Sequence, residues 1–128
     1  MKIMIIDDEM SVVVTVKAFL AELTTEVDFA YGGQEGVKKM QENPGYDLLI
    51  LDFMMSGMSG LDVCKAMAED ANMKKIPVLL ISALPVTSAE LHDLLEEFNQ
   101  THMVKGALEK PFSKDVLLDA VRKITGVV

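Results

Sequence analysis

The chain has 128 residues and a mass of 14.1 kDa, the usual size of a single domain. It carries 20 acidic and 12 basic side chains, which gives a formal net charge of -8 with neutral histidines. That excess of acid argues against direct nucleic-acid binding and against attachment to an anionic membrane surface, because both need a basic face. The single cysteine, Cys64, excludes an internal disulfide and any zinc site built from several cysteines.

No stretch of the sequence is typical of a membrane span or of a secretion signal. The longest apolar run without a charge, Val78–Val86, is far shorter than the ~20 residues that a membrane-spanning helix needs. The apolar start of the chain, Met1–Ile6, is followed at once by Asp7, Asp8 and Glu9 rather than by small residues. We therefore expect a cytoplasmic protein.

The first half of the chain alternates between short apolar runs and amphipathic stretches. Short apolar runs are typical of buried strands, and apolar residues spaced by three and four are typical of helices. In chain order the patterns predict a strand over Lys2–Ile6, a helix over Ser11–Leu23, a strand over Glu26–Tyr31, a helix over Gln34–Glu42 and a strand over Tyr46–Phe53.

The second half continues the alternation. The run from Thr87 to Glu90 has the pattern of a capping box, and Ser113 can cap the last helix. The predicted elements are a helix over Leu61–Glu69, a strand over Pro77–Ala83, a helix over Thr87–Asn99, a weaker strand over His102–Glu109 and a final helix after Ser113.

Five strand–helix units in sequence define the expected fold class. Alternating strands and helices with buried strands imply an α/β protein with a parallel sheet covered by helices on both faces. We expect one doubly wound (βα)5 domain over residues 1–128, with the flavodoxin-like strand order 2-1-3-4-5.

Polar side chains follow the strands at the edge of the sheet where ligands bind. In a doubly wound sheet, ligands bind beyond the carboxyl ends of the strands. The strand ends carry three aspartates, a hydroxyl and a lysine: Asp7 and Asp8 after the first strand, Asp52 on the third, Ser82 on the fourth and Lys110 after the fifth. The strand assignments alone therefore predict that these five side chains converge.

The chemistry of these groups points to phosphoryl transfer. Clustered carboxylates repel one another unless a cation joins them, and hard oxygen ligands with open positions suit Mg²⁺. A carboxylate can attack phosphorus and hold an aspartyl phosphate, while a divalent ion neutralises charge on the transferring oxygens. A lysine can neutralise another phosphoryl oxygen, and a hydroxyl can hydrogen-bond a third. The five side chains supply every part that phosphorylation on an aspartate needs.

Four segments of the sequence carry a resemblance to a known family. They are 5–9 (IIDDE), 51–61 (LDFMMSGMSGL), 81–83 (ISA) and 110–112 (KPF). Each segment is weak alone, but four in this order, each at a predicted strand end, are highly specific. Over its whole length the chain resembles a response-regulator receiver domain of two-component signalling.

The resemblance implies a role for each matching residue. Asp52 would be the phosphoacceptor, Ser82 the switch hydroxyl that moves toward the phosphoryl group, and Lys110 the ionic partner of that group. The peptide bond between Lys110 and Pro111 would be a candidate for the cis form. The ligands of Mg²⁺ would be Asp8 directly, Asp7 directly or through water, Asp52, and the backbone carbonyl of Met54.

The resemblance also implies partners. The phosphoryl donor would be a phosphohistidine on a sensor histidine kinase or on a histidine phosphotransfer domain. Phosphorylation would change the surface around the fourth and fifth strand–helix units and so control a downstream protein target, or a phosphorylation-dependent homodimer. Such a domain is not a conventional enzyme, although it assists its own phosphorylation and dephosphorylation. It would be either a stand-alone receiver or a piece of a larger regulator.

Three departures from the family pattern concern the output of the switch. Ser56 stands where a proline is usual, so the loop after the phosphoacceptor loses a fixed φ angle. Ala107 stands where the family often has an aromatic switch residue, so the usual aromatic rotation cannot occur there. The segment between Ser82 and Lys110, residues 83–109, is longer than usual and contains Pro85.

Three other functions compete with a phosphorylated switch. A phosphatase-like hydrolase would need a second catalytic acid two residues after the nucleophile, where the chain has Met54. A flavin-binding module would need a phosphate-binding loop after the first strand, where Asp7, Asp8 and Glu9 would repel a phosphate. A degenerate receiver that binds a partner without phosphorylation is opposed by the presence of Asp52 and Lys110, but Ala107 keeps this alternative open.

Overall fold

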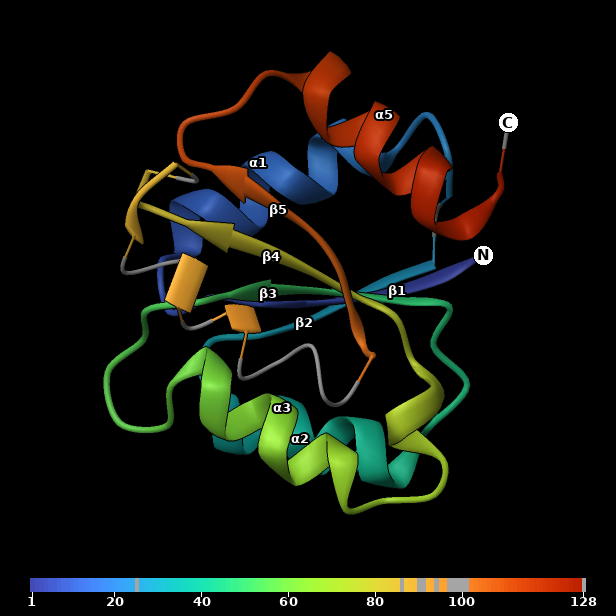
Figure 1. Cartoon of the computed structure of the whole chain (residues 1–128). Helices are drawn as coiled ribbons and strands as arrows, with labels where there is room; N and C mark the ends of the chain where they lie inside the picture. The colour runs from blue at the N-terminus through green and yellow to red at the C-terminus, as the bar shows by residue number, and fades with distance from the viewer. Residues whose placement is uncertain (25, 86, 90–91, 94, 97–101, 128) are drawn as a thin grey trace.

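The computed structural model describes the chain except for residues 25, 86, 90–91, 94, 97–101 and 128 (Figure 1). Its elements in chain order are β1 (Lys2–Ile6), α1 (Met10–Leu20), β2 (Glu26–Ala30), α2 (Gly33–Glu42), β3 (Leu48–Asp52), α3 (Gly60–Ala68), a 3-10 turn η1 (Met73–Lys75), β4 (Val78–Ser82), β5 (Val104–Glu109) and α5 (Lys114–Thr125). Among the described residues, no helix is both long enough and apolar enough to cross a bilayer.

The five strands form one parallel sheet in the order β2-β1-β3-β4-β5. The α/β class, the parallel sheet and the strand order 2-1-3-4-5 that the sequence predicts are confirmed. Element ends differ by a few residues. The first helix ends at Leu20 instead of Leu23. The backbone forms a tight turn there, in which the N–H of Leu23 donates to the carbonyl of Leu20 at 2.8 Å.

The helix predicted over Thr87–Asn99 lies partly outside the described residues. Within the described part, Ala89, His92–Asp93 and Leu95–Glu96 are helical, and the N–H of His92 donates to the carbonyl of Ser88 at 3.0 Å. The last residue of the predicted capping box, Glu90, is not among the described residues. The cap predicted for the final helix is present, since the N–H of Val116 donates to Ser113 Oγ at 3.2 Å.

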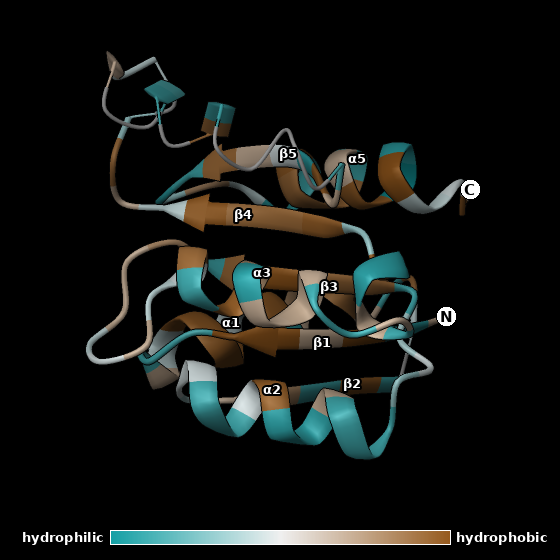
Figure 2. Ribbon diagram, turned by 60° about the horizontal axis from the view of Figure 1, so that its bottom comes forward, coloured by the Kyte–Doolittle hydropathy of each residue, from teal (hydrophilic) through white to brown (hydrophobic). Residues whose placement is uncertain are grey.

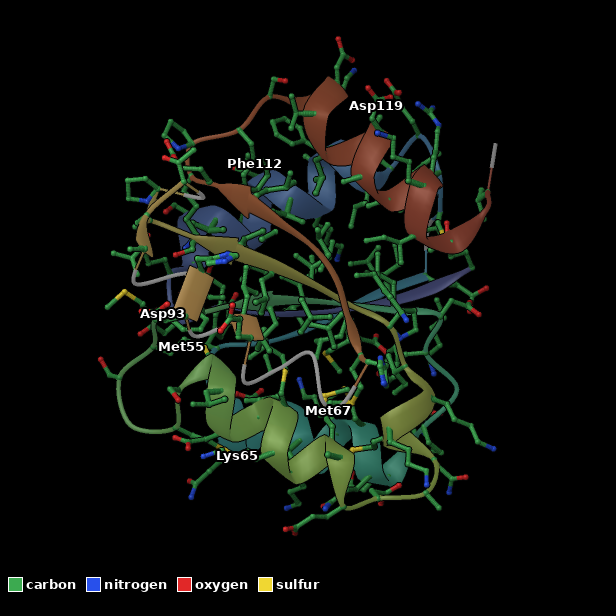
Figure 3. All side chains as sticks on the ribbon, in the orientation of Figure 1. Met55, Lys65, Met67, Asp93, Phe112 and Asp119 are labelled. Atoms are coloured by element: carbon green, nitrogen blue, oxygen red, sulfur yellow. The ribbon has the colours of Figure 1, made fainter. Side chains whose placement is uncertain are left out.

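The sheet separates two apolar cores. Helices α1 and α5 cover one face and α2 and α3 cover the other (Figure 1). Figure 2 shows β1, β3 and β4 as mainly hydrophobic and α2 as mainly hydrophilic. Figure 3 shows the two faces of α3: Met67 points toward the sheet and is fully buried, while Lys65 is exposed. Because β3 and β4 are buried along their whole length, only their ends can present polar groups to a ligand.

The strand register aligns the carboxyl ends of the sheet. Ile6 of β1 is opposite Leu51 of β3, so the residues that follow each of them, Asp7 and Asp52, lie at the same level of the sheet. Ser82 of β4 is opposite Glu109 of β5, which places Lys110 one residue beyond. The register therefore brings residues from four strands to one edge.

The edge strand β5 is irregular. Its pairing with β4 shifts between Val78 and Leu79, because Val78 is opposite Val104 while Leu79 is opposite Gly106. The extra residue in β5 is Lys105, which is exposed. Such a bulge bends the strand locally and increases its twist.

Gly60, the first residue of α3, lies tightly against the strand that ends in Asp52. A Cβ atom at this position would lie 2.8 Å from the carbonyl oxygen of Asp52 and 2.9 Å from the Cα of Phe53. The N–H of Gly60 also donates to the carbonyl of Phe53 at 3.1 Å. The absence of a side chain thus allows α3 to begin directly beneath the end of β3.

We expect Gly60→Ala to lower the free energy of unfolding by about 1–3 kcal/mol, the usual cost of adding a methyl group to a fully packed position. The new Cβ would meet backbone atoms, which cannot move aside as a side chain can. Urea unfolding followed by circular dichroism measures the effect. Gly45→Ala is the matched control, because no atom lies within 4 Å of its Cβ position. Equal stability of the two variants would contradict this account of Gly60.

Candidate functional site

The ammonium group of Lys110 lies between two of the carboxylates at the carboxyl edge of the sheet. Its Nζ is 2.8 Å from Asp7 Oδ2 and 3.4 Å from Asp52 Oδ1. Asp7 is fully buried and Asp52 is 3% exposed, so both charges need a compensating partner. The peptide bond that joins Lys110 to Pro111 is cis, as the resemblance implies.

Three carboxylates gather at this edge. One carboxylate oxygen from each of Asp7, Asp8 and Asp52 lies within 4.8 Å of the others, and Asp8 is the exposed member of the group. One lysine does not balance three carboxylates, so the cluster keeps excess negative charge at neutral pH. Oxygen ligands in such an arrangement, with one side open to solvent, suit a divalent ion of the Mg²⁺ type.

The burial of Asp52 changes its acidity. Loss of hydration raises the pKa of Asp52 from its ordinary 3.8 to about 6, and the negative charge of Asp7 acts in the same direction. Lys110 and the N–H of Met54, which donates to Asp52 Oδ1 at 3.3 Å, act against this rise. Burial alone would lower the pKa of Lys110, but its hydrogen bond to Asp7 and the charge of Asp52 raise it above the ordinary value. The lysine therefore stays charged in the site.

Backbone N–H groups hold the other carboxylate oxygens. The N–H of Glu9 donates to Asp7 Oδ1 at 2.9 Å, and the N–H of Ser56 donates to Asp8 Oδ2 at 3.2 Å. The second bond ties the loop after β3 to the loop after β1. A proline at position 56 could not make it, because proline has no N–H. The Ser56 departure from the family pattern thus supplies a contact between the two loops.

Ser82 lies at the end of β4 and is fully buried. Its Oγ accepts a hydrogen bond from the N–H of Leu84 at 3.0 Å, and its carbonyl accepts one from the N–H of Lys110 at 2.7 Å. The backbone of the residue after β5 is therefore fixed directly to the end of β4. A change at either Ser82 or Lys110 can pass to the other through this bond.

The structure brings together the side chains of Asp7, Asp8, Asp52 and Lys110, with Ser82 at the same edge. Met54 lies two residues after Asp52, is 55% exposed, and lines a cavity of about 670 Å³ together with Asp8 and Met55. The role of the Met54 carbonyl as a metal ligand stays a prediction. Sequence reasoning missed that Lys110 pairs first with Asp7, and it missed the N–H of Ser56. Neither contact has a signal in the residue types alone.

Comparison with known proteins agrees with this geometry. The family model described as "Response regulator receiver domain" matches residues 3–122. The chain is 33% identical to the chemotaxis protein CheY of Pseudomonas aeruginosa over 97% of this chain and 95% of that protein. It is 31% identical to the regulatory protein VanRB of Enterococcus faecalis over 96% of this chain, but spans only 51% of that relative. It is also similar to the crystallised chemotaxis protein CheY4 of Vibrio cholerae, with a TM-score of 0.84, 28% identity, and 96% and 97% of the two chains covered.

The fold and the site together match this family: a parallel sheet in the order 2-1-3-4-5 has an acidic cluster and a lysine at its carboxyl edge. The chain belongs to the family of response regulator receiver domains. The resemblance that the sequence motifs indicated is confirmed. Phosphoryl-accepting switching is the general function of this family.

We expect the metal-free protein to lose stability as the pH rises from about 4 to about 6, through the contribution of Asp52. The folded state binds this proton more tightly than the unfolded state, so unfolding releases it and becomes easier at higher pH. Asp52→Asn removes that penalty. The variant should exceed the parent in free energy of unfolding by about 1–2 kcal/mol at pH 7, a value reduced from 1.36 kcal/mol per pKa unit for residual solvation.

Urea unfolding at pH 4 and pH 7 in the presence of EDTA measures this difference. The advantage of Asp52→Asn in free energy of unfolding should fall toward zero at pH 4, where Asp52 is protonated in the folded parent protein. Asp119→Asn is the control, because it removes an exposed carboxylate on α5 whose only ion pair among the described residues is the exposed one with Arg122 at 3.8 Å. A gain for Asp52→Asn that is the same at both pH values would contradict the raised pKa.

Proposed function

We propose that this domain is a phosphoryl-accepting signalling switch in which Asp52 takes a phosphoryl group from a phosphohistidine in a Mg²⁺-dependent reaction. The observation that carries the proposal is the position of Asp52. Its carboxylate is almost fully buried, contacts Lys110 at 3.4 Å and lies with Asp7 and Asp8 in one cluster. A carboxylate that would act as the nucleophile, two acids that would bind the metal, and a cation therefore lie close together.

The acidic cluster fits a magnesium ion. Asp7, Asp8 and Asp52 provide hard oxygen ligands within 4.8 Å of one another, and the carbonyl of Met54 would add another. Excess negative charge on three carboxylates facing one lysine favours a divalent cation there. The ion would neutralise negative charge on the phosphoryl oxygens as they approach the acidic cluster.

Each of these residues would have its own role in the phosphoryl transfer. An oxygen of the Asp52 carboxylate attacks phosphorus, the bond between phosphorus and the donor imidazole nitrogen breaks, and the imidazole leaves with the electron pair of that bond. The N–H of Met54, already hydrogen-bonded to Asp52 Oδ1, orients the carboxylate. The Lys110 ammonium is close enough to neutralise one oxygen of the new phosphoryl group.

Ser82 and Lys110 would connect phosphorylation to the surface. The phosphoryl group offers acceptor oxygens to both side chains, and the bond from the Lys110 N–H to the Ser82 carbonyl couples the ends of β4 and β5. When Ser82 Oγ turns toward the phosphoryl group, it gives up the N–H of Leu84. The segment after β4 therefore rearranges, and a downstream protein or a second copy of the domain can distinguish the two states.

The donor would be a sensor histidine kinase or a histidine phosphotransfer domain, since both carry a phosphohistidine. The alternative function is that of a degenerate receiver, which binds a partner without phosphorylation. The observation that favours it is Ala107, which is only partly buried and cannot provide an aromatic rotation. Phosphorylation in solution distinguishes the two functions.

We expect intact-mass spectrometry to detect the gain of one phosphoryl group after incubation with phosphoramidate and Mg²⁺. The gain should vanish for Asp52→Ala, which lacks the nucleophile, and in EDTA. Asp119→Asn should be phosphorylated like the parent protein, because its carboxylate is exposed on α5. Absence of the gain in the parent protein, with Mg²⁺ binding shown separately by calorimetry, would overturn the proposal and favour the degenerate receiver.

We expect Ser82→Ala to gain the phosphoryl group but to lose most of the phosphorylation-induced change in amide chemical shifts at residues 83–85 and 104–110. Ser82→Thr keeps the hydroxyl and should retain the change. Ser82→Ala should also lower the free energy of unfolding by about 1 kcal/mol, because the N–H of Leu84 loses its acceptor. Equal shift changes in the two variants would show that the hydroxyl is not the connection.

A further inference from the structure

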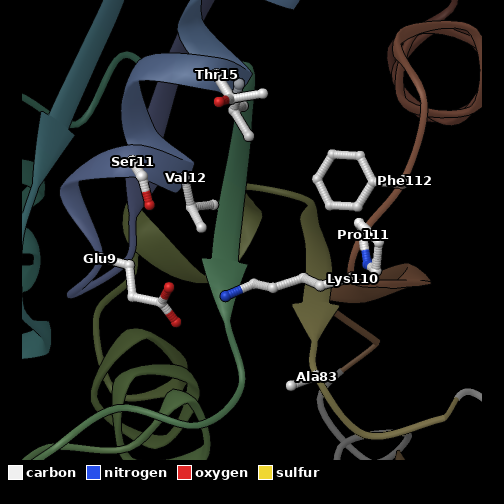
Figure 4. A pocket seen from close by; sticks show the side chains of 9 residues that line it. Glu9, Ser11, Val12, Thr15, Ala83, Lys110, Pro111 and Phe112 are labelled. Atoms are coloured by element: carbon white, nitrogen blue, oxygen red, sulfur yellow. The ribbon is translucent and has the colours of Figure 1, made fainter.

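A cavity of about 430 Å³ lies beside the phosphoacceptor site without including Asp52. It opens between the start of α1 and the loop that joins β5 to α5 (Figure 4). This volume is within the range of small-molecule binding sites in proteins. The lining residues are Glu9, Ser11, Val12, Thr15, Val16, Ala83, Lys110, Pro111 and Phe112.

The cavity has apolar sides and a polar end. Figure 4 shows the Phe112 ring on one side and Val12 and Thr15 of α1 on the other. Val12 and Phe112 are only partly buried, so their apolar surface is available to a ligand. The carboxylate of Glu9 and the side chain of Lys110 lie at one end of the cavity (Figure 4). An occupant would therefore place an apolar body between the sides and a polar group at that end.

The charge at the polar end is set by Glu9. Among the residues that the structure describes, none forms an ion pair with the Glu9 carboxylate or donates a side-chain hydrogen bond to it. The Lys110 ammonium cannot serve as its partner without leaving Asp7 and Asp52. With Asp8 also nearby, one ammonium group stands among four carboxylates. The end of the cavity thus has an unmatched negative charge and attracts a cation.

We propose that this cavity binds a small organic cation, an ammonium or guanidinium group carried on an apolar ring or chain. The apolar part lies between Val12 and Phe112, and the cationic group lies beside Glu9. Such a ligand also touches Ala83, which follows Ser82, and Lys110 itself. This binding does not depend on phosphorylation of Asp52 and goes beyond the proposed switch.

Nuclear magnetic resonance titration of the metal-free protein with 2-phenylethylammonium tests the proposal. The expected result is a saturable change in amide chemical shifts confined to residues 9–16, 83–84 and 110–112. The neutral analogue 2-phenylethanol, which has the same ring and chain, should bind about 3- to 5-fold more weakly, the range of an exposed ion pair. Ethylammonium, which lacks the ring, should not saturate.

Matched variants test which residues contact the cationic group of the ligand and which contact its apolar part. Glu9→Gln should lower the affinity for 2-phenylethylammonium about 3- to 5-fold, since it removes one exposed ion pair. The affinity for 2-phenylethanol should not change. Glu69→Gln, which removes an exposed carboxylate at the end of α3, should change neither. Ala83→Leu should lower the affinity for both ligands, because the larger side chain fills part of the cavity. Shifts that increase linearly over the whole surface, or an equal effect of Glu9→Gln and Glu69→Gln, would overturn the proposal.

Discussion

The contact of the Lys110 ammonium with Asp7 and Asp52 is the interaction on which the arrangement of the site depends. It joins residues 103 positions apart, one after the first strand and one after the last. Without a cation at this point, two almost fully buried carboxylates would face each other uncompensated, a situation that usually costs several kcal/mol. The lysine therefore fixes this edge of the sheet. It balances only part of the charge of the acidic cluster, so the cluster keeps excess negative charge.

The sheet order explains why these residues can meet at all. In the order β2-β1-β3-β4-β5, the central strands β1 and β3 are neighbours and end at the same level. Their apolar bodies are buried between two helical layers, so polarity is confined to the residues that follow each strand. The close start of α3 at Gly60 then keeps the loop after Asp52 near the acidic cluster. The strand order thus determines both the packing of the core and the position of the polar groups at its edge.

The fold and the membership of the site were predictable because they follow from periodicity. The apolar run 48–51 predicts a buried strand, and any buried strand in this topology delivers its next polar residue, here Asp52, to the carboxyl edge. The choice of Asp7 as the closer partner of Lys110 was not predictable, since it depends on side-chain reach between strands distant in sequence. The hydrogen bond from the Ser56 N–H to Asp8 was hidden for another reason: backbone groups are the same at every residue except proline. The end of the first helix was misplaced by three residues because Leu23 continues its apolar spacing although the backbone has already turned.

The bulge in β5 has a consequence for how copies of this domain can meet. An edge strand with regular hydrogen-bonding groups is a template on which another chain can add a strand, and parallel sheets have two such edges. In β5 the bulge at Lys105 breaks the regular spacing of those groups and places a charge on the open edge. A growing ribbon of sheets between molecules is therefore disfavoured at this edge.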